Sequence, residues 1–453
     1  MAQMLTRFKI ESLYNLENID VPIESNRLVL VGENGTGKST VANLITYFLT
    51  CQWNKMLRYE FKRIIAHFGS VEIVLDRNLL LTSDRREFFE VNRRNLSRSQ
   101  FELMLAKQEN NYANIDEYLN DKDRSQEILV KYIGDSDDIK ETSKKLLTIE
   151  KKIRQNFSDQ ILYLPTYRRI EQDLQSIFPQ IDLDEIRYRS RHQKSHNIEK
   201  SSFIELVEFG MKDVEIMMKK RLEDIRDYVL SSLSNLTGTY LRDVIKGDYR
   251  TADLLSKLST IDELSIEPIL NRIPQVILTE QERVKLREII HKIRTEGIVA
   301  EEDKVVAHFL AKLIDLYQTQ LTRESDVREF IKVGNQYLSG KELVYDNASF
   351  KLSIQQKIKG NEVIQIELKM LSSGEKQIIS LFSHIYLSGQ KDFFVVIDEP
   401  ELSLSVPWQK RFLPDILATN RCSGIIAVTH SPFIFDNEFD KYAHSIEEFL
   451  ELI

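Results

Sequence analysis

The chain has 453 residues, of which 42% are hydrophobic and 29% charged, and its formal net charge at pH 7 is −8. Because such a length exceeds what one compact core usually holds, we expect more than one structural unit. The sequence contains no run of about 18 uncharged apolar residues, which argues against a membrane span, and its acidic balance does not by itself indicate a nucleic-acid-binding protein.

The N-terminus, MAQMLTRFKIESLYN, lacks the apolar core of a signal peptide. The two cysteines, Cys51 and Cys422, lie far apart in the sequence and are expected to be buried thiols rather than a disulfide framework. Both features favour a cytoplasmic protein.

Strand-rich ends flank a long helical middle. In residues 1–84, FKIESLYNL alternates, and NRLVLVG and GSVEIVLD are two further predicted strands. Residues 85–335 are charged and mostly helical, with one predicted strand in DQILYLPTYRRI at 159–170. In residues 336–453 strands return, in YLSGKELVYDNASFKLSIQQKI, FFVVIDEP and GIIAVTHSP. The predicted fold is α/β, a mixed sheet with flanking helices, whose two lobes are split by a long α-helical or coiled-coil insertion.

The helical middle shows apolar residues at i, i+3 and i+4 spacing in FELMLAKQENNYANIDEYL and VVAHFLAKLIDLYQTQL. In the second segment the predicted buried face comprises Val306, Phe309, Leu310, Leu313, Leu316 and Tyr317. The basic run RYRSRHQKSH at 187–196 is either a solvated linker or a contact for nucleic acid or a partner, and the sequence leaves both open.

The stretch LVLVGENGTGKSTVANLI, residues 28–45, predicts a buried strand, a glycine-rich turn and a helix, and it fills the pattern G-x-x-x-x-G-K-[ST]. Glycines in such a turn let backbone N–H groups point inward and cradle phosphates, and the helix N-terminus adds its positive dipole end. Lys38 is placed to reach the β- and γ-phosphates, and the Ser39 hydroxyl to hold Mg²⁺. The candidate phosphate-binding residues are Gly32, Asn34, Gly35, Gly37, Lys38, Ser39 and Thr40.

A second motif, FFVVIDEPELSL, places carboxylates at the end of a strand. Residues 394–397 are apolar and predict a strand buried on both faces, with Asp398 at its carboxyl end, where α/β sheets bind ligands. Asp398 is the second candidate Mg²⁺ ligand beside Ser39, and Glu399 is a candidate general base that polarises the attacking water. The alternative is a pair of carboxylates at the start of a helix.

Two further motifs carry weaker signals. In MLSSGEKQIISL, residues 371–382, Ser372 and Gly374 either cap the following helix or form an anion site at its N-terminus, and the two roles are compatible. In GIIAVTHSPFIF, His430 follows a predicted buried strand. A single histidine is more often structural than catalytic, but at this position it could hydrogen-bond a γ-phosphate or the attacking water.

In this order the motifs resemble the ABC ATPase superfamily. GENGTGKST looks like Walker A, LSSGEKQ like the signature motif, IDEP like Walker B with its catalytic glutamate, ELSL like the D-loop, and THS like the histidine switch. Ser373 stands where transporters usually carry glycine. The wide separation of Lys38 and Ser372, without a membrane span, is similar to the SMC, RecF and OLD-like branch, whose heads are split by helical insertions.

The resemblance implies an ATPase that uses ATP and Mg²⁺ and forms head–head dimers, with hydrolysis that is slow and regulatory. ATP would lie between Walker A of one head and Ser372 and Gly374 of the other, with Glu399 and His430 in catalytic roles. It also implies a Q-loop, for which Gln172 is the candidate and Gln52 the alternative. Arg168 and Arg169 are either interface or phosphate-sensing arginines, or a plain surface pair.

The segment ILYLPTYRRIEQDL also resembles ATPases of bacterial antiphage islands. In size and layout the chain is most similar to the ATPase family of the PARIS defence system (AriA), and next to the Septu ATPases (PtuA). Both pair an ABC-type ATPase with a separately encoded nuclease. The resemblance implies a homo-oligomeric sensor or scaffold that controls this nuclease and releases it on meeting a phage protein. After the histidine motif we expect about one helix, in NEFDKYAHSIEEFLELI, and not the Toprim domain of OLD nucleases.

The main rival interpretation is a RecF- or SMC-like DNA repair or recombination ATPase that acts directly on DNA. It predicts a basic stripe on the head and hydrolysis stimulated by DNA, so nucleic acid is left open as a partner. A third class, a nucleotide-dependent scaffold without hydrolysis, is disfavoured because Glu399 stands beside Asp398.

Overall fold

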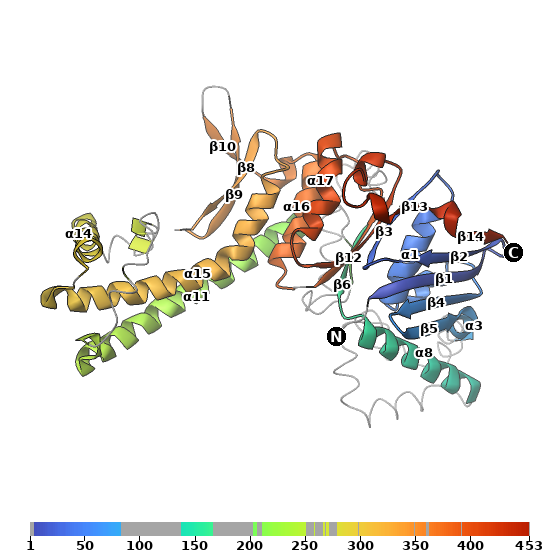
Figure 1. Ribbon diagram of the computed structural model, residues 1–453, viewed down its shortest axis with the longest axis horizontal. Coiled ribbons are helices and arrows are strands. Elements are labelled where there is room, and N and C mark those ends of the chain that lie inside the picture. Colours follow the sequence, from blue (N-terminus) through green and yellow to red (C-terminus); the bar gives the residue numbers. More distant parts are fainter. Residues whose placement is uncertain are drawn as a thin grey trace, which may run out of the picture. The chain divides into compact units, whose positions relative to one another are not determined.

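The computed structural model divides the chain into two compact units (Figure 1), which are described separately. The head unit comprises Met1–Asp213, Ser372–Ile385 and Gly389–Ile453, and the helical unit comprises Val214–Leu371 and Tyr386–Ser388. The structure describes residues 4–82, 137–165, 203–205, 211–250, 258, 266–267, 269–270, 279–297, 299–347, 349–358, 362–390 and 392–452. The sequence-predicted boundary at 84/85 lies outside these residues, and the one at 335/336 stays a prediction.

The head unit contains an antiparallel sheet with the strand order β14-β2-β1-β4-β5. Its strands are β1 (Leu5–Leu13), β2 (Glu17–Pro22), β4 (Arg63–Phe68), β5 (Val71–Asp76) and β14 (Leu450–Leu452). Along β1 the apolar side chains of Leu5, Phe8 and Ile10 are fully buried. One face of the sheet therefore packs into the core and the other carries polar groups.

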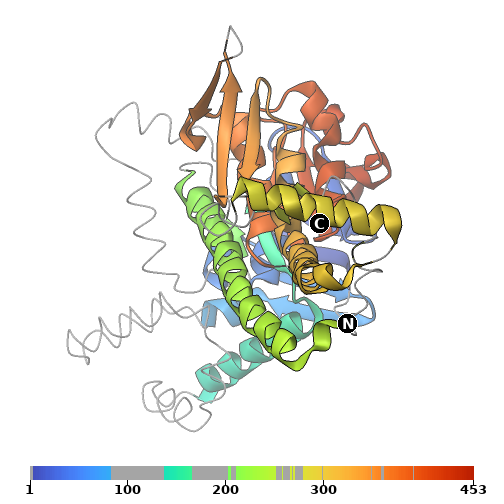
Figure 2. The same ribbon diagram turned by 90° about the vertical axis from the view of Figure 1, so that its left-hand side faces the viewer.

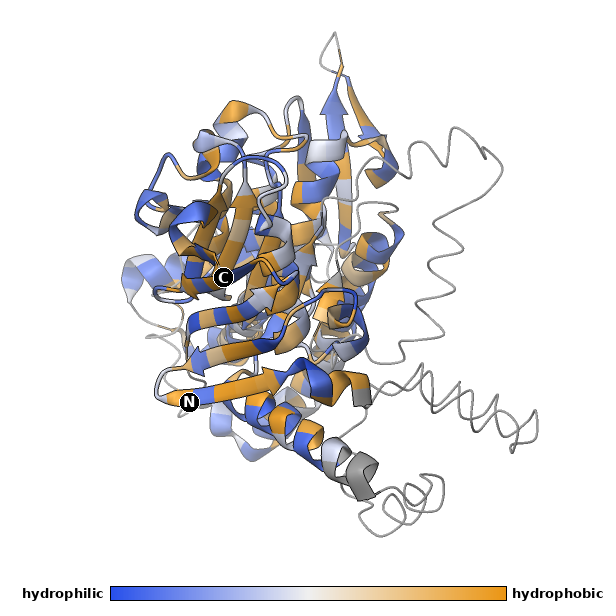
Figure 3. Cartoon of the chain, turned by 90° about the vertical axis from the view of Figure 1, so that its right-hand side faces the viewer, coloured by the Kyte–Doolittle hydropathy of each residue, from blue (hydrophilic) through white to orange (hydrophobic). Residues whose placement is uncertain are grey.

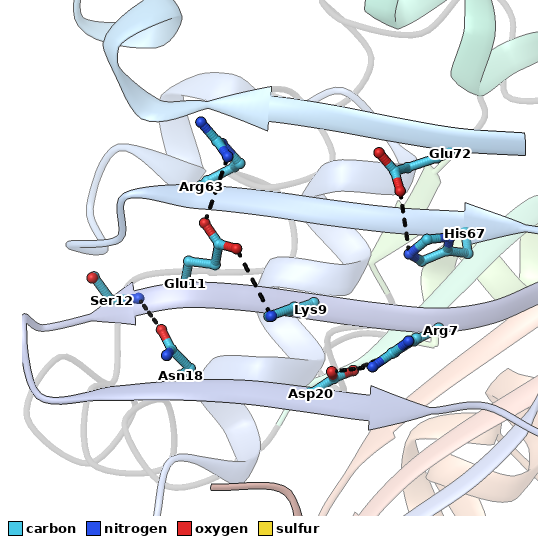
Figure 4. Close-up of polar contacts among 9 residues, drawn as sticks. All are labelled: Arg7, Lys9, Glu11, Ser12, Asn18, Asp20, Arg63, His67 and Glu72. Atoms are coloured by element: carbon cyan, nitrogen blue, oxygen red, sulfur yellow. Dashed lines mark hydrogen bonds and ion pairs between the residues drawn. The ribbon is translucent and has the colours of Figure 1, made fainter. Parts of the chain in front are cut away.

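Polar contacts, most of them between neighbouring strands, line this sheet (Figure 4). Arg7 Nε donates to Asp20 Oδ1 at 2.6 Å, and the Glu11 carboxylate lies 3.8 Å from Arg63 and 3.9 Å from Lys9. Figure 4 also draws His67 with Glu72, and the Ser12 backbone N–H with the Asn18 side chain. Exposed ion pairs contribute about 0–1 kcal/mol each, so the buried face holds this sheet in place.

The second sheet of the head unit is parallel throughout, with the order β13-β3-β12-β11-β6-β7. Its strands are β3 (Arg27–Val31), β6 (Gln160–Leu164), β7 (Phe203–Glu205), β11 (Phe393–Asp398), β12 (Cys422–Thr429) and β13 (Ala443–Ser445). All six residues of β11 are buried. Figure 3 shows hydrophobic colour along strands inside the head, as expected when helices cover a parallel sheet.

Helix α1 (Lys38–Leu49) joins the two sheets of the head unit into one core. Phe48 of α1 packs edge-on against Phe8 of β1, with ring centroids 5.6 Å apart, and Val41, Ile45 and Phe48 share a buried cluster with strands β11 and β12. The other helices that the structure describes in this unit are α2 (Trp53–Met56), α3 (Arg77–Thr82), α8 (Asp137–Asn156), α16 (Ser373–Leu387) and α17 (Val406–Leu417). Short 3₁₀ turns lie at Pro432–Ile434, Asp440–Tyr442 and Ile446–Phe449.

The helical unit is built on two long antiparallel helices, α11 (Lys212–Lys246) and α15 (Lys304–Gly334). Arg221 of α11 pairs with Asp326 of α15 at 2.8 Å, whereas Asp243 near the end of α11 meets Lys312 at 2.7 Å. The unit also holds α14 (Glu280–Glu296), 3₁₀ turns at Asp248–Arg250, Glu301–Asp303 and Leu368–Met370, and the antiparallel strands β8 (Lys341–Asp346), β9 (Lys351–Lys357) and β10 (Val363–Ile366), drawn in orange in Figure 2.

The predicted fold class is confirmed: an α/β head with flanking helices is interrupted by a mainly helical unit. The apolar face predicted in α15 is also confirmed, because Leu310, Leu313 and Tyr317 are buried and Val306, Phe309 and Leu316 pack against them. The segment FELMLAKQENNYANIDEYL and the basic run at 187–196 lie outside the described residues. None of the helices that the structure describes is long and apolar enough to cross a bilayer.

The C-terminal segment corrects one prediction, since it forms no long helix. Ala443–Ser445 pairs with β3 as strand β13, Ile446–Phe449 is a 3₁₀ turn, and Leu450–Leu452 pairs with β2 as β14. The open edges of both sheets supply backbone partners for this short segment. Those partners come from residues more than four hundred positions earlier, which a local periodicity does not reveal.

Candidate functional site

The phosphate loop lies between β3 and α1, as predicted. Gly35 and Gly37 have backbone φ angles of +87° and +90°, a region that favours glycine, and Gly37 is the N-cap of α1. Asn34 and Gly35 are exposed, and Thr40 is half-buried in the first turn of α1. The loop therefore opens to solvent at the helix N-terminus, where free backbone N–H groups suit an anion.

Lys38 is the most enclosed side chain of this loop, with 4% of the residue exposed. Its Nζ donates to the carbonyl oxygens of Gly32 at 3.0 Å and Glu33 at 2.5 Å, and lies 3.4 Å from Thr36 Oγ1. The ammonium group thus folds back on the loop's own carbonyls. Bound phosphates would offer it stronger, charged acceptors.

Several carboxylates surround this ammonium. Burial lowers the pKa of Lys38, while the negative charges of Glu447, Asp398, Glu399 and Glu401 favour its charged form and oppose that shift. These four carboxylates outnumber the single ammonium group, so the charge around Lys38 is suited to a further cation such as Mg²⁺.

Ser39 and Asp398 meet, although the sequence separates them by 359 positions. The Ser39 hydroxyl donates to Asp398 Oδ1 at 2.9 Å, and Asp398 is 5% exposed at the end of β11. Parallel pairing of β11 and β3 with β12 between them brings the two residues to one edge of the sheet. A hydroxyl and a carboxylate that converge beside a phosphate loop fit Mg²⁺, which prefers oxygen ligands and completes its shell with water and phosphate oxygens.

Glu399 follows Asp398 in an uncommon backbone conformation, with φ +52°. Its backbone N–H donates to the carbonyl oxygen of Val428 at 2.8 Å, which ties the turn to β12. A left-handed conformation at a residue other than glycine costs of order 1 kcal/mol, and such strain often marks functional positions. Glu399 directly follows the candidate metal ligand Asp398 in the sequence and is half-buried. Its role as a general base stays a prediction.

His430 is exposed at the end of β12, and its backbone is fixed by a carboxylate. Glu401 Oε1 accepts the His430 backbone N–H at 2.7 Å, and Glu401 Oε2 accepts the Thr429 hydroxyl at 2.7 Å. On the other side of the histidine, the Ser431 hydroxyl donates to Gln409 Oε1 at 2.6 Å.

The SSGE segment caps α16. The Ser372 backbone N–H donates to Glu375 Oε2 at 2.7 Å, and the Glu375 backbone N–H lies 3.4 Å from Ser372 Oγ, so the two residues form a capping box. Gly374 is buried against the loop that follows β11. A Cβ at this position would overlap the backbone oxygen of Ser403 and approach the Trp408 ring to 3.4 Å. The predicted cap is thus present, and the glycine permits a close approach between two backbones.

Of the residues considered for the Q-loop, the structure describes only Gln52. Gln172, Arg168 and Arg169 lie outside the described residues. Gln52, the alternative, is the N-cap residue of α2, and its Nε2 donates to Thr50 Oγ1 at 2.8 Å.

The sequence reading missed three residues beside the predicted site, Glu401, Gln409 and Glu447. Glu401 stands within the DEPEL segment and could have been weighed as a further carboxylate. Gln409 and Glu447 carry no local signal, because each reaches the site only through tertiary contacts. The Glu447 carboxylate lies against the phosphate loop, 3.4 Å from where a Cβ on Gly32 would stand.

Comparisons with known proteins place these observations in a family. The model of the AAA ATPase domain matches residues 4–435. No curated protein matches the chain. Among solved structures, the Smc head domain with an extended coiled coil, bound to the C-terminal domain of ScpA, from Pyrococcus furiosus is 12% identical, with a TM-score of 0.36 and 99% of this chain and 96% of that one covered.

Two further solved structures also have low sequence identity and low TM-scores. The Smc head domain with a coiled coil and joint from Pyrococcus yayanosii is 15% identical, with a TM-score of 0.31 and coverage of 95% of this chain and 93% of that one. The SMC head domain from Thermotoga maritima is 21% identical, with a TM-score of 0.17 and coverage of 26% and 44%. The family assignment rests on the domain model, which spans nearly the whole chain: the protein belongs to the AAA ATPase domain family.

Proposed function

We propose that this chain is the ABC-type ATPase subunit of a bacterial antiphage defence complex, a sensor or scaffold that oligomerises through its heads and controls a separately encoded nuclease. The observation that carries the ATPase part is the Ser39–Asp398 hydrogen bond of 2.9 Å beside the buried Lys38. The defence role rests on the resemblance to PARIS and Septu ATPases, with the PARIS type preferred.

In the proposed reaction each site residue has one task. The backbone of the phosphate loop and Lys38 bind and orient the phosphates. Ser39 and Asp398 would hold Mg²⁺, which would supply charge neutralisation at the transferred phosphoryl group. Glu399 takes a proton from the attacking water, and His430 donates a hydrogen bond to the γ-phosphate or that water.

The proposed head–head contact is based on the capped N-terminus of α16. Ser372 and Ser373 are exposed there, whereas Gly374 is buried within its own head. An exposed helix N-terminus with a serine hydroxyl suits the γ-phosphate bound by a second head. ATP would then hold two heads together, and hydrolysis would release them.

The first experiment traps the ATP-bound state. Glu399→Gln, which should bind ATP without hydrolysing it, is expected to form a stable dimer or larger oligomer in size-exclusion chromatography with light scattering, in the presence of Mg²⁺ and ATP. Lys38→Ala is the matched control and should stay in the nucleotide-free state. If Glu399→Gln with ATP is no larger than the wild type, the head–head proposal fails.

The second experiment addresses the defence role. The chain is co-expressed with its genomic neighbours, purified with ATP, and its mass is measured. A complex of several copies that carries a nuclease supports the proposal. A lone monomer or dimer that binds DNA and hydrolyses ATP faster in its presence would instead favour a RecF- or SMC-like repair ATPase.

A further inference from the structure

The Glu401 carboxylate connects the two segments that carry the proposed catalytic groups. Glu401 lies in the turn after β11, two residues beyond Glu399, and its partners are the last residue of β12 and the residue after it. Oε2 accepts the hydroxyl of Thr429 and Oε1 the backbone N–H of His430, both at 2.7 Å. Both carboxylate oxygens are therefore used to hold the histidine segment.

Backbone hydrogen bonds hold the chain on either side of this contact. Thr429 pairs with Val31 of β3 at the end of the parallel sheet, and the Glu399 backbone N–H donates to the carbonyl oxygen of Val428. Within the turn, the backbone N–H of Leu404 donates to the carbonyl oxygen of Glu401. Glu401 thus lies between two anchored strands, and its side chain sets the path of the chain where β12 ends.

A second link holds the other side of the histidine. Gln409 of α17 is 8% exposed, and its Nε2 donates to the Leu404 carbonyl oxygen at 2.9 Å. Its Oε1 accepts the Ser431 hydroxyl at 2.6 Å. Glu401 therefore holds the backbone of His430, and Gln409 holds the side chain of the next residue, Ser431. The His430 residue itself stays exposed.

We propose that Glu401 is a positioning residue for ATP hydrolysis, which fixes the backbone of His430 so that the imidazole faces the reacting phosphate beside Glu399. This inference rests on the catalytic role of His430 in the proposed function. Misplacing a catalytic group by about 1 Å can cost on the order of a hundredfold in rate. Because Glu401 touches neither the phosphate loop residues nor Asp398 by a described hydrogen bond, its loss should affect turnover more than nucleotide binding.

A competing explanation is that Glu401 acts through its charge, since it is also among the carboxylates that surround Lys38. Glu401→Gln separates the two. The amide oxygen can still accept the His430 N–H, and the amide N–H can donate to the Thr429 hydroxyl oxygen, while the charge is gone. Glu401→Ala removes both bonds and the charge.

The test measures kcat and KM for ATP in wild type, Glu401→Ala, Glu401→Gln, His430→Ala and the double variant. We expect Glu401→Ala to lower kcat about tenfold or more, with KM changed less than about threefold. Glu401→Gln should keep most of the wild-type kcat. In the His430→Ala background, Glu401→Ala should add little, because no imidazole remains to be positioned.

Glu282→Ala is the matched control. The Glu282 carboxylate accepts the backbone N–H and the hydroxyl of Thr279, both at 2.7 Å, the same two kinds of bond in the helical unit. It should leave kcat unchanged. If Glu401→Ala does not fold, Thr429→Val is the second variant: it removes the hydroxyl's bond to Glu401 and the 3.0 Å bond that the same hydroxyl accepts from the Ser431 backbone N–H. It should lower kcat about threefold.

Three outcomes would overturn the proposal: equal losses in Glu401→Ala and Glu401→Gln, a rise in KM in place of a fall in kcat, or additive losses in the double variant. Different results would contradict the proposed function. An inactive wild type, or a His430→Ala variant with full activity, would contradict the ATPase mechanism itself and not the positioning contact alone.

Discussion

The hydroxyl of Ser39 donates to Asp398 Oδ1 at 2.9 Å and so joins the first turn of α1 to the end of β11. The pair predicts that Mg²⁺ strengthens ATP binding only when both of these side-chain oxygens are present. Ser39→Ala and Asp398→Asn should each weaken binding of Mg²⁺–ATP about tenfold or more, because each removes one of the two protein oxygens proposed to hold the metal. With the metal removed by EDTA, both variants should bind ATP as the wild type does, which isothermal titration calorimetry can measure.

A matched control exists at the other end of β12. The Ser423 hydroxyl donates to the carboxylate of Asp159 at 2.5 Å, another serine–aspartate pair in the same unit. Ser423→Ala should leave Mg²⁺–ATP binding unchanged. Equal losses in Ser39→Ala and Ser423→Ala would mean that these pairs matter for the fold and not for the metal.

Glu447 predicts an electrostatic effect on nucleotide binding. Its carboxylate lies against Gly32, and its negative charge favours the charged form of Lys38. It therefore competes with phosphates for that lysine and repels them. Glu447→Gln should tighten ATP binding roughly two- to fivefold at low salt, and the gain should shrink as ionic strength rises.

Glu438→Gln is the control for this effect, since it removes an exposed carboxylate from the same unit. It should leave the affinity unchanged. A weaker affinity in Glu447→Gln would show that the carboxylate binds part of the nucleotide instead of opposing it.

Gly374 predicts a steric requirement at the start of α16. Gly374→Ala would place a Cβ onto the backbone oxygen of Ser403, and overpacking of this kind costs about 1–3 kcal/mol. We expect a lower Tm and loss of the ATP-dependent dimer, while nucleotide binding to the single head persists, because the phosphate loop is a separate segment. Calorimetry and light scattering test the two effects.

Gly238 provides the contrast, because a Cβ there meets no atom within 4 Å and the residue lies inside α11. Gly238→Ala should raise the stability of the helix by about 0.5–1 kcal/mol. A normal dimer in Gly374→Ala would show that the Ser403 backbone yields without moving the SSGE segment.

The two cysteines predict slow alkylation. Burial raises the pKa of Cys51 and of Cys422 to about 12 each. Only about one thiol in ten thousand would then be ionised at pH 8, and the thiolate is the reactive form. Folded protein should resist iodoacetamide at pH 8 and react faster as the pH rises, whereas guanidinium-unfolded protein should label quickly at both sites. Cys51 is buried and Cys422 is half-buried, so rapid labelling of Cys51 in the folded chain, detected by mass spectrometry, would contradict its buried environment.

The local sequence pattern predicted those turns, strands and helix caps that depend on interactions between residues close together in the sequence. The glycines of GENGTGKST permit left-handed backbone angles, and this turn places Lys38 and Ser39 in the first turn of helix α1. The apolar run before Asp398 likewise reads as a buried strand without any knowledge of its neighbours. The serine at 372 and the glutamate three residues later predict a helix cap, which the capping box realises.

Other features depend on partners that no window of the sequence contains. The final residues form strands β13 and β14, not a helix, because two sheet edges offer them hydrogen bonds. Glu401 meets His430, and Glu447 reaches Gly32, because the sheet order places those segments together.

The chemical groups of this ATPase and the local geometry of its phosphate loop thus follow from the order of its amino acids, since sterics and capping act over a few residues. Which of these groups meet depends on the folding of the whole chain. Strand order sets Ser39 beside Asp398 across 359 positions, and hydrogen bonds formed only in the folded chain hold His430 in place.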